Sequence, residues 1–168
     1  MKRLFFTLII SFFLVAGCGL GTSAFTDAVL DGASNLNRGK TEKALKDFNR
    51  AIEIDPAHQD GYLGRADTLN TMGLYEESLE DYNKALEIKP TLAKAYVNRA
   101  IAYSHLGQYE KAIADYEKGL ELDPEIDDKP SFFKRLFSND PNTVKGIREH
   151  LEFLKQKVKD SGSEIKSG

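Results

Sequence analysis

The chain has 168 residues, and its 26 acidic and 23 basic side chains give a formal net charge of −3. This balance argues against a nucleic-acid partner, because a phosphate-binding surface needs a basic stripe and the sequence has none. The only cysteine is Cys18, which excludes a disulfide within the chain.

The N-terminus has the pattern of a secretion signal. Lys2 and Arg3 precede an apolar run from Leu4 to Ala16, which has signal-peptide length and is short for a permanent membrane helix. Small residues stand directly before Cys18, and this string resembles the lipobox of bacterial lipoproteins. The resemblance implies that residues 1–17 are a cleaved signal peptide and that Cys18 carries a lipid anchor. An ordinary secretory signal or a single membrane anchor is the alternative interpretation.

Residues 18–24 are predicted to be a flexible tether, which as a Gly/Ser coil reaches on the order of 15 Å. The folded part is therefore expected close to the lipid surface, in the cell envelope. Gly19 follows Cys18, which resembles the sorting pattern that permits export to the outer membrane. We expect the periplasmic face of the outer membrane in a bacterium with two membranes, and otherwise the outer face of the cell membrane.

From Phe25 onward the sequence repeats every 34 residues, a period marked by Pro56, Pro90 and Pro124. The residues before each proline align in four further columns, which hold glycine (Gly39, Gly73, Gly107), aspartate (Asp47, Asp81, Asp115), an aromatic residue (Phe48, Tyr82, Tyr116) and a small residue (Ala51, Ala85, Gly119). A period kept across so many columns predicts stacked units, each of which buries its apolar face against its neighbours.

Each unit is predicted to be a pair of helices. The second helices span Glu42–Ile54, Glu76–Ile88 and Glu110–Leu122, and each begins at a glutamate that suits the positive end of the helix dipole. The downstream proline stops each of them. The aligned glycines fall between the paired helices, where a left-handed turn favours glycine.

These columns resemble the tetratricopeptide repeat. The third unit matches its pattern best, through the residues Tyr96, Arg99-Ala100, Tyr103, Ala112, Tyr116 and Pro124. The first unit departs from the pattern in its opening helix, at Asp31-Gly32. The resemblance implies an all-α, right-handed superhelical solenoid of three antiparallel helix pairs, over residues 25–58, 59–92 and 93–126, plus a C-terminal capping helix.

In such a solenoid the first helix of each pair lines the inner face. The resemblance places a partner-binding groove there, with exposed side chains that take an extended peptide or a partner helix; the alternative is a solvated face without a ligand. The predicted groove residues are Asp60, Leu63, Asp67, Asn70, Lys94, Val97, Asn98, Ile101 and His105, with Thr26, Val29 and Ala33 in the first unit.

Some members of the family hold a chaperone's C-terminal carboxylate with a clamp of Lys, Asn and Arg side chains on this face. In this chain only Lys94 matches the clamp, because the other places hold Val29, Ala33, Gly64 and Asn98. The resemblance therefore predicts a protein or peptide ligand of another kind.

Beyond Pro124 the period fails. Residues 127–140 are predicted to be a linker, whose segment Phe132–Phe137 either packs under the last helix or contacts lipid. A helix over residues 141–160 carries an apolar stripe and is expected to cap the last repeat, with a coiled-coil dimer as the alternative. The stripe consists of Val144, Ile147, Leu151, Leu154 and Val158, and residues 161–168 are predicted to be a disordered tail.

The sequence offers little to support catalysis. Its histidines, His58, His105 and His150, fall in three different elements without a metal-ligand partner at helical spacing. The aspartates of the repeat column are expected to face solvent. We therefore predict no enzyme, no metal and no cofactor. The predicted function is a membrane-anchored interaction module acting as a scaffold or assembly adaptor, and the alternative is an envelope lipoprotein that dimerises through its C-terminal helix.

Overall fold

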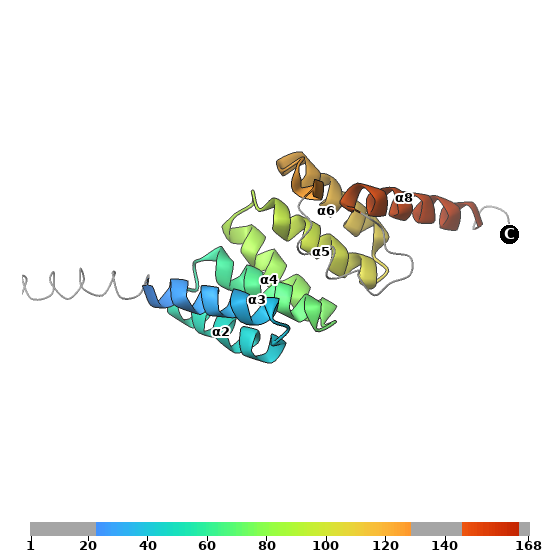
Figure 1. The fold of residues 1–168 in the computed structure, drawn as a ribbon. Helices are drawn as coiled ribbons and strands as arrows, with labels where there is room; N and C mark the ends of the chain where they lie inside the picture. The colour runs from blue at the N-terminus through green and yellow to red at the C-terminus, as the bar shows by residue number, and fades with distance from the viewer. Residues whose placement is uncertain (1–22, 129–145, 165–168) are drawn as a thin grey trace, which may run out of the picture.

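The computed structural model describes residues 23–128 and 146–164 (Figure 1). The predictions for the signal peptide and Cys18, for Phe132–Phe137, for Val144 and for the last four residues lie outside this part of the chain. The described elements are helical: a helix over residues 23–37, then α2 (Thr41–Ile54), α3 (Gln59–Thr71), α4 (Tyr75–Ile88), α5 (Ala93–His105), α6 (Tyr109–Leu122), the short 3-10 helix η1 (Ile126–Asp128) and α8 (Ile147–Glu164).

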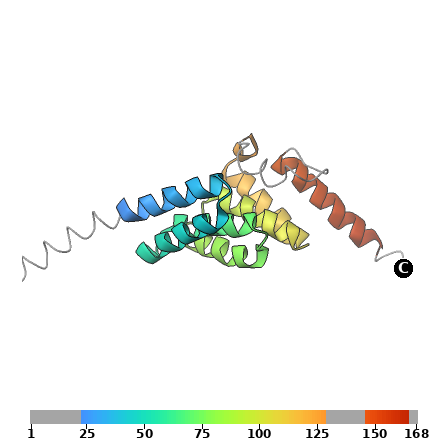
Figure 2. The ribbon, with the colours of Figure 1, turned by 60° about the horizontal axis from the view of Figure 1, so that its bottom comes forward.

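The helices form antiparallel pairs that stack in chain order, from the N-terminal pair at one end to α8 at the other (Figures 1 and 2). The second helix of each pair ends at the residue that the sequence predicts. The glycines between paired helices have positive φ angles of 72° at Gly39, 79° at Gly73 and 71° at Gly107, which confirms the left-handed turn. The chain thus folds as an all-α solenoid of helix pairs.

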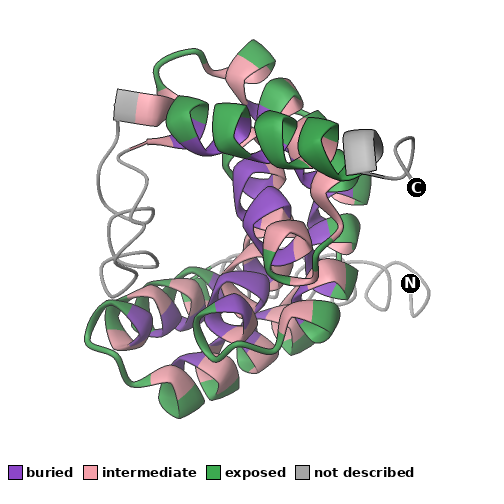
Figure 3. Ribbon diagram, turned by 90° about the vertical axis from the view of Figure 1, so that its right-hand side faces the viewer, coloured by how far each residue is buried: buried purple, intermediate pink, exposed green. Residues whose placement is uncertain are grey.

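Small residues let the two helices of a pair approach closely. Ala51 and Ala85 are fully buried, and a Cβ atom on Gly119 would lie 2.7 Å from the Val97 side chain. Buried segments lie along the facing sides of the helices, and the outer sides are exposed (Figure 3). The column of small residues is therefore a packing column.

Two of the three aspartates in the repeat column are buried and the third, Asp47, is half-buried, which corrects the expectation that the column faces solvent. Asp81 and Asp115 are 6% and 7% exposed. Two hydrogen bonds of 2.7 Å join the Arg65 guanidinium to Asp81, and Arg99 binds Asp115 in the same way. Each arginine also donates to an asparagine of the preceding repeat, Asn49 or Asn83, so the pairs connect successive units.

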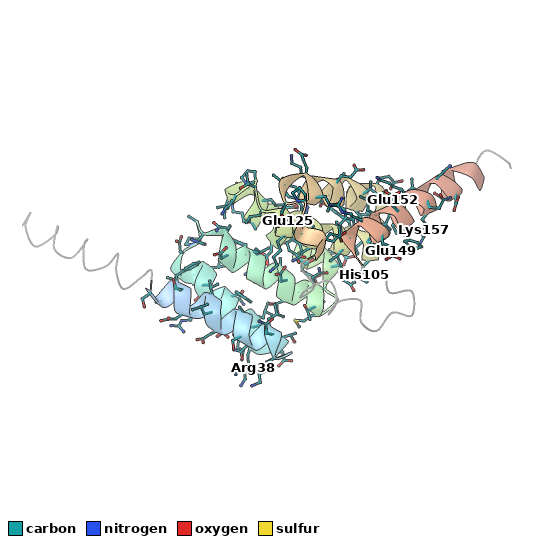
Figure 4. All side chains as sticks on the ribbon, turned by 45° about the horizontal axis from the view of Figure 1, so that its top comes forward. Arg38, His105, Glu125, Glu149, Glu152 and Lys157 are labelled. Atoms are coloured by element: carbon teal, nitrogen blue, oxygen red, sulfur yellow. The ribbon has the colours of Figure 1, made fainter. Side chains whose placement is uncertain are left out.

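Helix α8 caps the last repeat. Its stripe residues Ile147, Leu151 and Leu154 are buried in one cluster with Ile101 and Tyr116. Asp127 of η1 accepts a hydrogen bond from the Ile147 N–H and so caps the N-terminus of α8. The opposite face of the helix carries charged side chains, among them Glu152 and Lys157 (Figure 4), together with the exposed ring of Phe153; the Lys157 ammonium lies 4.5 Å from the centre of the Tyr109 ring.

The end of α8 corrects the predicted tail. The helix continues through Glu164, whereas the sequence placed its end at Asp160. Within residues 23–128 and 146–164, every helix is too short or too polar to cross a membrane.

Candidate functional site: the inner face of the helix stack

A hollow of about 360 Å³ opens on the inner face. It is bounded by the helix over residues 23–37, by α2 and α3, and by the start of α5. Five of its lining residues are apolar side chains, one is a glycine and three are charged. The lining consists of Val29, Ala33, Leu36, Asn37, Phe48, Asp60, Leu63, Gly64, Asp67 and Lys94.

The Phe48 ring forms the apolar floor of the hollow, and two glycines make room for it. A Cβ atom on Gly32 would lie 2.9 Å from the ring, and one on Gly64 would overlap it. Both glycines lie on first helices of their pairs, and the ring comes from the second helix between them. The apolar hollow thus depends on missing side chains on two facing helices.

One wall of the hollow is a buried polar network. Asp67 is 3% exposed, and its carboxylate accepts hydrogen bonds from the Tyr82 hydroxyl at 2.9 Å and from the Asn98 amide at 2.6 Å. Its other oxygen lies 2.8 Å from the Lys94 ammonium. The charge of Asp67, followed by its hydrogen bond and by the charge of Asp60, raises the pKa of Lys94 against the opposing effect of burial. Two side chains of α5, Lys94 and Asn98, therefore both contact the Asp67 carboxylate of the same chain.

Asn70 completes this network. Its amide nitrogen lies 3.4 Å from the Tyr82 hydroxyl and 3.3 Å from the Asn98 carbonyl, while its Oδ1 is buried without a partner. Burial, the charge of Asp67 and the hydrogen bond to it raise the pKa of Tyr82 well above its ordinary value. The Tyr82 hydroxyl therefore stays a hydrogen-bond donor to Asp67 at neutral pH.

Four of the predicted groove residues, Asp60, Leu63, Asp67 and Lys94, meet at the hollow, as do Val29 and Ala33 of the first unit. Asn70 and Asn98 are buried behind it rather than exposed, at 2% and 1%.

The remaining predicted residues lie elsewhere. Val97 and Ile101 are buried in the core cluster that α8 covers, so they are also not exposed as predicted. His105 is exposed at the end of α5, where its ring stacks on Tyr75 at 4.3 Å (Figure 4). Thr26 is exposed and outside the lining of the hollow.

Sequence reasoning missed Leu36, Asn37 and Phe48 as lining residues, whereas it had placed Gly64 on this face, at a clamp position without a clamp side chain. A sequence signal for Phe48 was present. Gly32 and Gly64 lie on the first helices of two successive pairs, and Phe48 lies on the helix between them in the chain.

In the third repeat, the position that corresponds to the hollow is covered by α8. Tyr116, the counterpart of Tyr82, makes a 3.0 Å hydrogen bond with Nδ1 of His150, whose Nε2 lies 3.4 Å from the Ser104 hydroxyl. Ile101 stands where the second repeat has Asp67. Around Ile101 the counterpart of the Asp67 network is thus an apolar cluster with one buried histidine.

Metal chemistry finds no support in the part of the chain that the structure describes, which holds no group of three His, Cys, Asp or Glu side chains able to bind an ion. The stacked helix pairs and the hollow on their inner face place the chain in the class of helix-pair solenoids. Family models of the tetratricopeptide repeat match residues 33–58 and 93–126, and one described as TPR repeat matches residues 66–107. The matched residues belong to the tetratricopeptide repeat family.

Similar proteins include an uncharacterized protein of Methanocaldococcus jannaschii, which is 44% identical over 39 residues. That match covers 23% of this chain and 45% of the relative, so it spans less than half of either protein.

Among solved structures, the first TPR domain of Spaghetti (RPAP3) bound to the HSP90 peptide SRMEEVD has a TM-score of 0.66 at 21% identity, over 81% of this chain and 94% of the other. The second TPR domain of human RPAP3, in complex with the HSP70 peptide SGPTIEEVD, has a TM-score of 0.59 at 27% identity, over 62% and 87%. The chain thus shares its fold with these two TPR domains.

Proposed function

We propose that this chain is a protein-interaction module that binds a partner's peptide segment on its inner face and is held at a membrane by a lipid on Cys18. The observation that carries the proposal is the hollow floored by Phe48. An apolar pocket beside charged side chains on a helical groove suits an extended peptide that inserts one side chain. The human RPAP3 domain in complex with the HSP70 peptide supports a peptide as the kind of ligand.

The membrane tether is supported by the sequence from Lys2 to Cys18, where a basic start, an apolar run and small residues before the cysteine coincide. A lipid there would raise the local concentration of the module for partners at the same membrane. This location suits a scaffold or assembly adaptor of the cell envelope, on the outer membrane where a second membrane is present. A catalytic role is not part of the proposal.

The alternative of a dimer through the C-terminal helix is not favoured. Such a seam would need an exposed apolar stripe, and Ile147, Leu151 and Leu154 are buried against the last repeat within the same chain. The exposed face of α8 is mostly charged and holds a single large apolar side chain, Phe153, which is too little for an apolar stripe.

A site-specific photo-crosslinker tests the groove. The full chain, expressed in its source cells, carries the crosslinker at Leu63 in the hollow or at Ala114, which is exposed on α6. We expect a protein adduct from position 63 that is lost when Ala33→Gln fills the hollow, and no such adduct from position 114. Equal adducts from both positions, or adducts insensitive to Ala33→Gln, would contradict the proposal.

A further inference from the structure

The charges around the hollow point to the chemistry of its ligand, and the inference rests on the proposed function of this groove. Three charged side chains line the hollow: Asp60, Asp67 and Lys94. Two carboxylates thus face one ammonium. The ammonium is paired with Asp67 at 2.8 Å, and the Asn98 amide beside it is hydrogen bonded to the same carboxylate.

An incoming carboxylate would share the half-exposed Lys94 ammonium with Asp67, which already neutralises its charge, and it would have to compete with Asp67 for the Asn98 amide. Asp67 is 3% exposed and holds three partners in a fixed network, so its displacement would leave a buried charge without compensation. The places where relatives carry further clamp groups hold Val29, Ala33 and Gly64, which are apolar lining of the hollow. The side-chain donors in this lining are Lys94, which Asp67 neutralises, and the Asn37 amide, so a ligand carboxylate would meet no unbalanced positive charge there.

Asp60, in contrast, is available to a ligand cation. Its side chain is 44% exposed at the rim, in the first turn of α3. Two neighbours contact Asp60 and leave its carboxylate at the surface: the Gln59 amide donates a hydrogen bond to its Oδ1, and the His58 ring accepts one at Nδ1 from the Asp60 N–H and lies 3.7 Å from its Oδ2. The helix dipole of α3 offsets the carboxylate only in part, since it amounts to roughly half a charge.

We infer that the hollow selects an internal peptide segment in which an apolar side chain inserts over Phe48 and an adjacent lysine or arginine contacts Asp60, and that it rejects acidic C-terminal peptides. The apolar side chain supplies the buried area. The basic residue supplies the charge complementarity, which weakens with salt because Asp60 is exposed.

The test begins with a library of random nonapeptides with amidated C-termini, captured on the immobilised full chain in detergent. Peptides that Ala33→Gln no longer captures are sequenced. We expect enrichment of an apolar residue next to lysine or arginine. The peptide SGPTIEEVD, which the human relative binds, is the acidic probe and should bind more weakly than the selected peptides.

The selected peptide is then titrated against single variants by fluorescence anisotropy. Asp60→Asn should raise its Kd by about two- to fivefold, the size of an exposed ion pair, and remove most of its salt dependence. Asp31→Asn is the matched control, because Asp31 is exposed on the first helix and is not part of the lining. It should leave Kd unchanged.

Three results would overturn the inference, and they differ in what they imply. Enrichment of acidic peptides, or an unchanged Kd in Asp60→Asn, would refute the ligand class while the groove function stands. A library in which no peptide depends on Ala33 would refute the ligand class and the proposed groove function together.

Discussion

The Arg65 guanidinium holds the Asp81 carboxylate through two hydrogen bonds of 2.7 Å, across the two helices of one repeat. The same contact recurs one period later between Arg99 and Asp115. Each arginine also reaches an asparagine of the preceding unit. These planar, two-pronged contacts fix both the angle within a pair and the register between pairs, which positions the helices that line the groove.

We predict that Asp81→Ala lowers the free energy of unfolding by about 1–3 kcal/mol, because it removes a buried carboxylate and leaves the half-buried Arg65 guanidinium without its ionic partner. The measurement is the urea midpoint of the purified chain. Glu80→Ala on the same helix is the control, since Glu80 is exposed. Equal effects of the two variants would show that the ion pair adds nothing beyond an exposed contact.

The contact between Gly64 and Phe48 gives a second prediction. A methyl group on Gly64 would overlap the Phe48 ring, so Gly64→Ala should destabilise the fold by about 1–3 kcal/mol. In a Phe48→Leu background the same change should be neutral or stabilising, because alanine is the better helix former by roughly 0.5–1 kcal/mol. A double-mutant cycle by urea unfolding measures this coupling. Additive effects would place the ring away from Gly64.

The period of 34 residues was sufficient to predict the helix pairs, the ends of the second helices and the packing role of Ala85. It could not assign partners to Asp81, because periodicity marks a column without telling which face of the helix it occupies. The partner, Arg65, stands 16 residues away on the other helix of the pair. Whether the Arg65 side chain points toward Asp81 depends on the angle at which the two helices cross.

The groove shows the same limit. The resemblance placed Asn98 and Ile101 correctly on the first helix of the third pair. It did not predict that both side chains are buried. Asn98 is buried by a network of side chains from three helices, and Ile101 by α8. One signal was readable: Ile101 replaces the aspartate of the same column, Asp67, and an apolar residue there indicates that the last repeat is covered.

The lipid anchor is tested by Cys18→Ser in the full chain. We expect the variant to leave the membrane fraction, or to accumulate unprocessed, because the chain has no other cysteine that could carry the lipid. Metabolic labelling with palmitate and fractionation of the cells provide the measurement. Ser23→Ala, which leaves Cys18 in place, is the control. A processed, lipid-labelled Cys18→Ser protein in the membrane would refute the lipoprotein interpretation.

The buried tyrosines should titrate last of the seven in the chain. Burial raises the pKa of both Tyr82 and Tyr116 well above the ordinary value of 10.0, and Asp67 adds to the effect at Tyr82. The folded chain therefore keeps two protons that the unfolded chain releases. Stability is then fully present below about pH 10 and falls as the pH rises beyond it.

The measurement is the ultraviolet absorbance of tyrosinate as the pH rises, with circular dichroism recorded in parallel. We expect two phenols to ionise only as helicity is lost, and Tyr116→Phe to remove one of them. This variant keeps the ring between α6 and α8 but loses the hydroxyl that bonds His150. Ionisation of all seven tyrosines while the helical signal is intact would mean that solvent reaches the network behind the hollow. The fixed Asp67 network, on which the selection against acidic ligands depends, would then have to be abandoned.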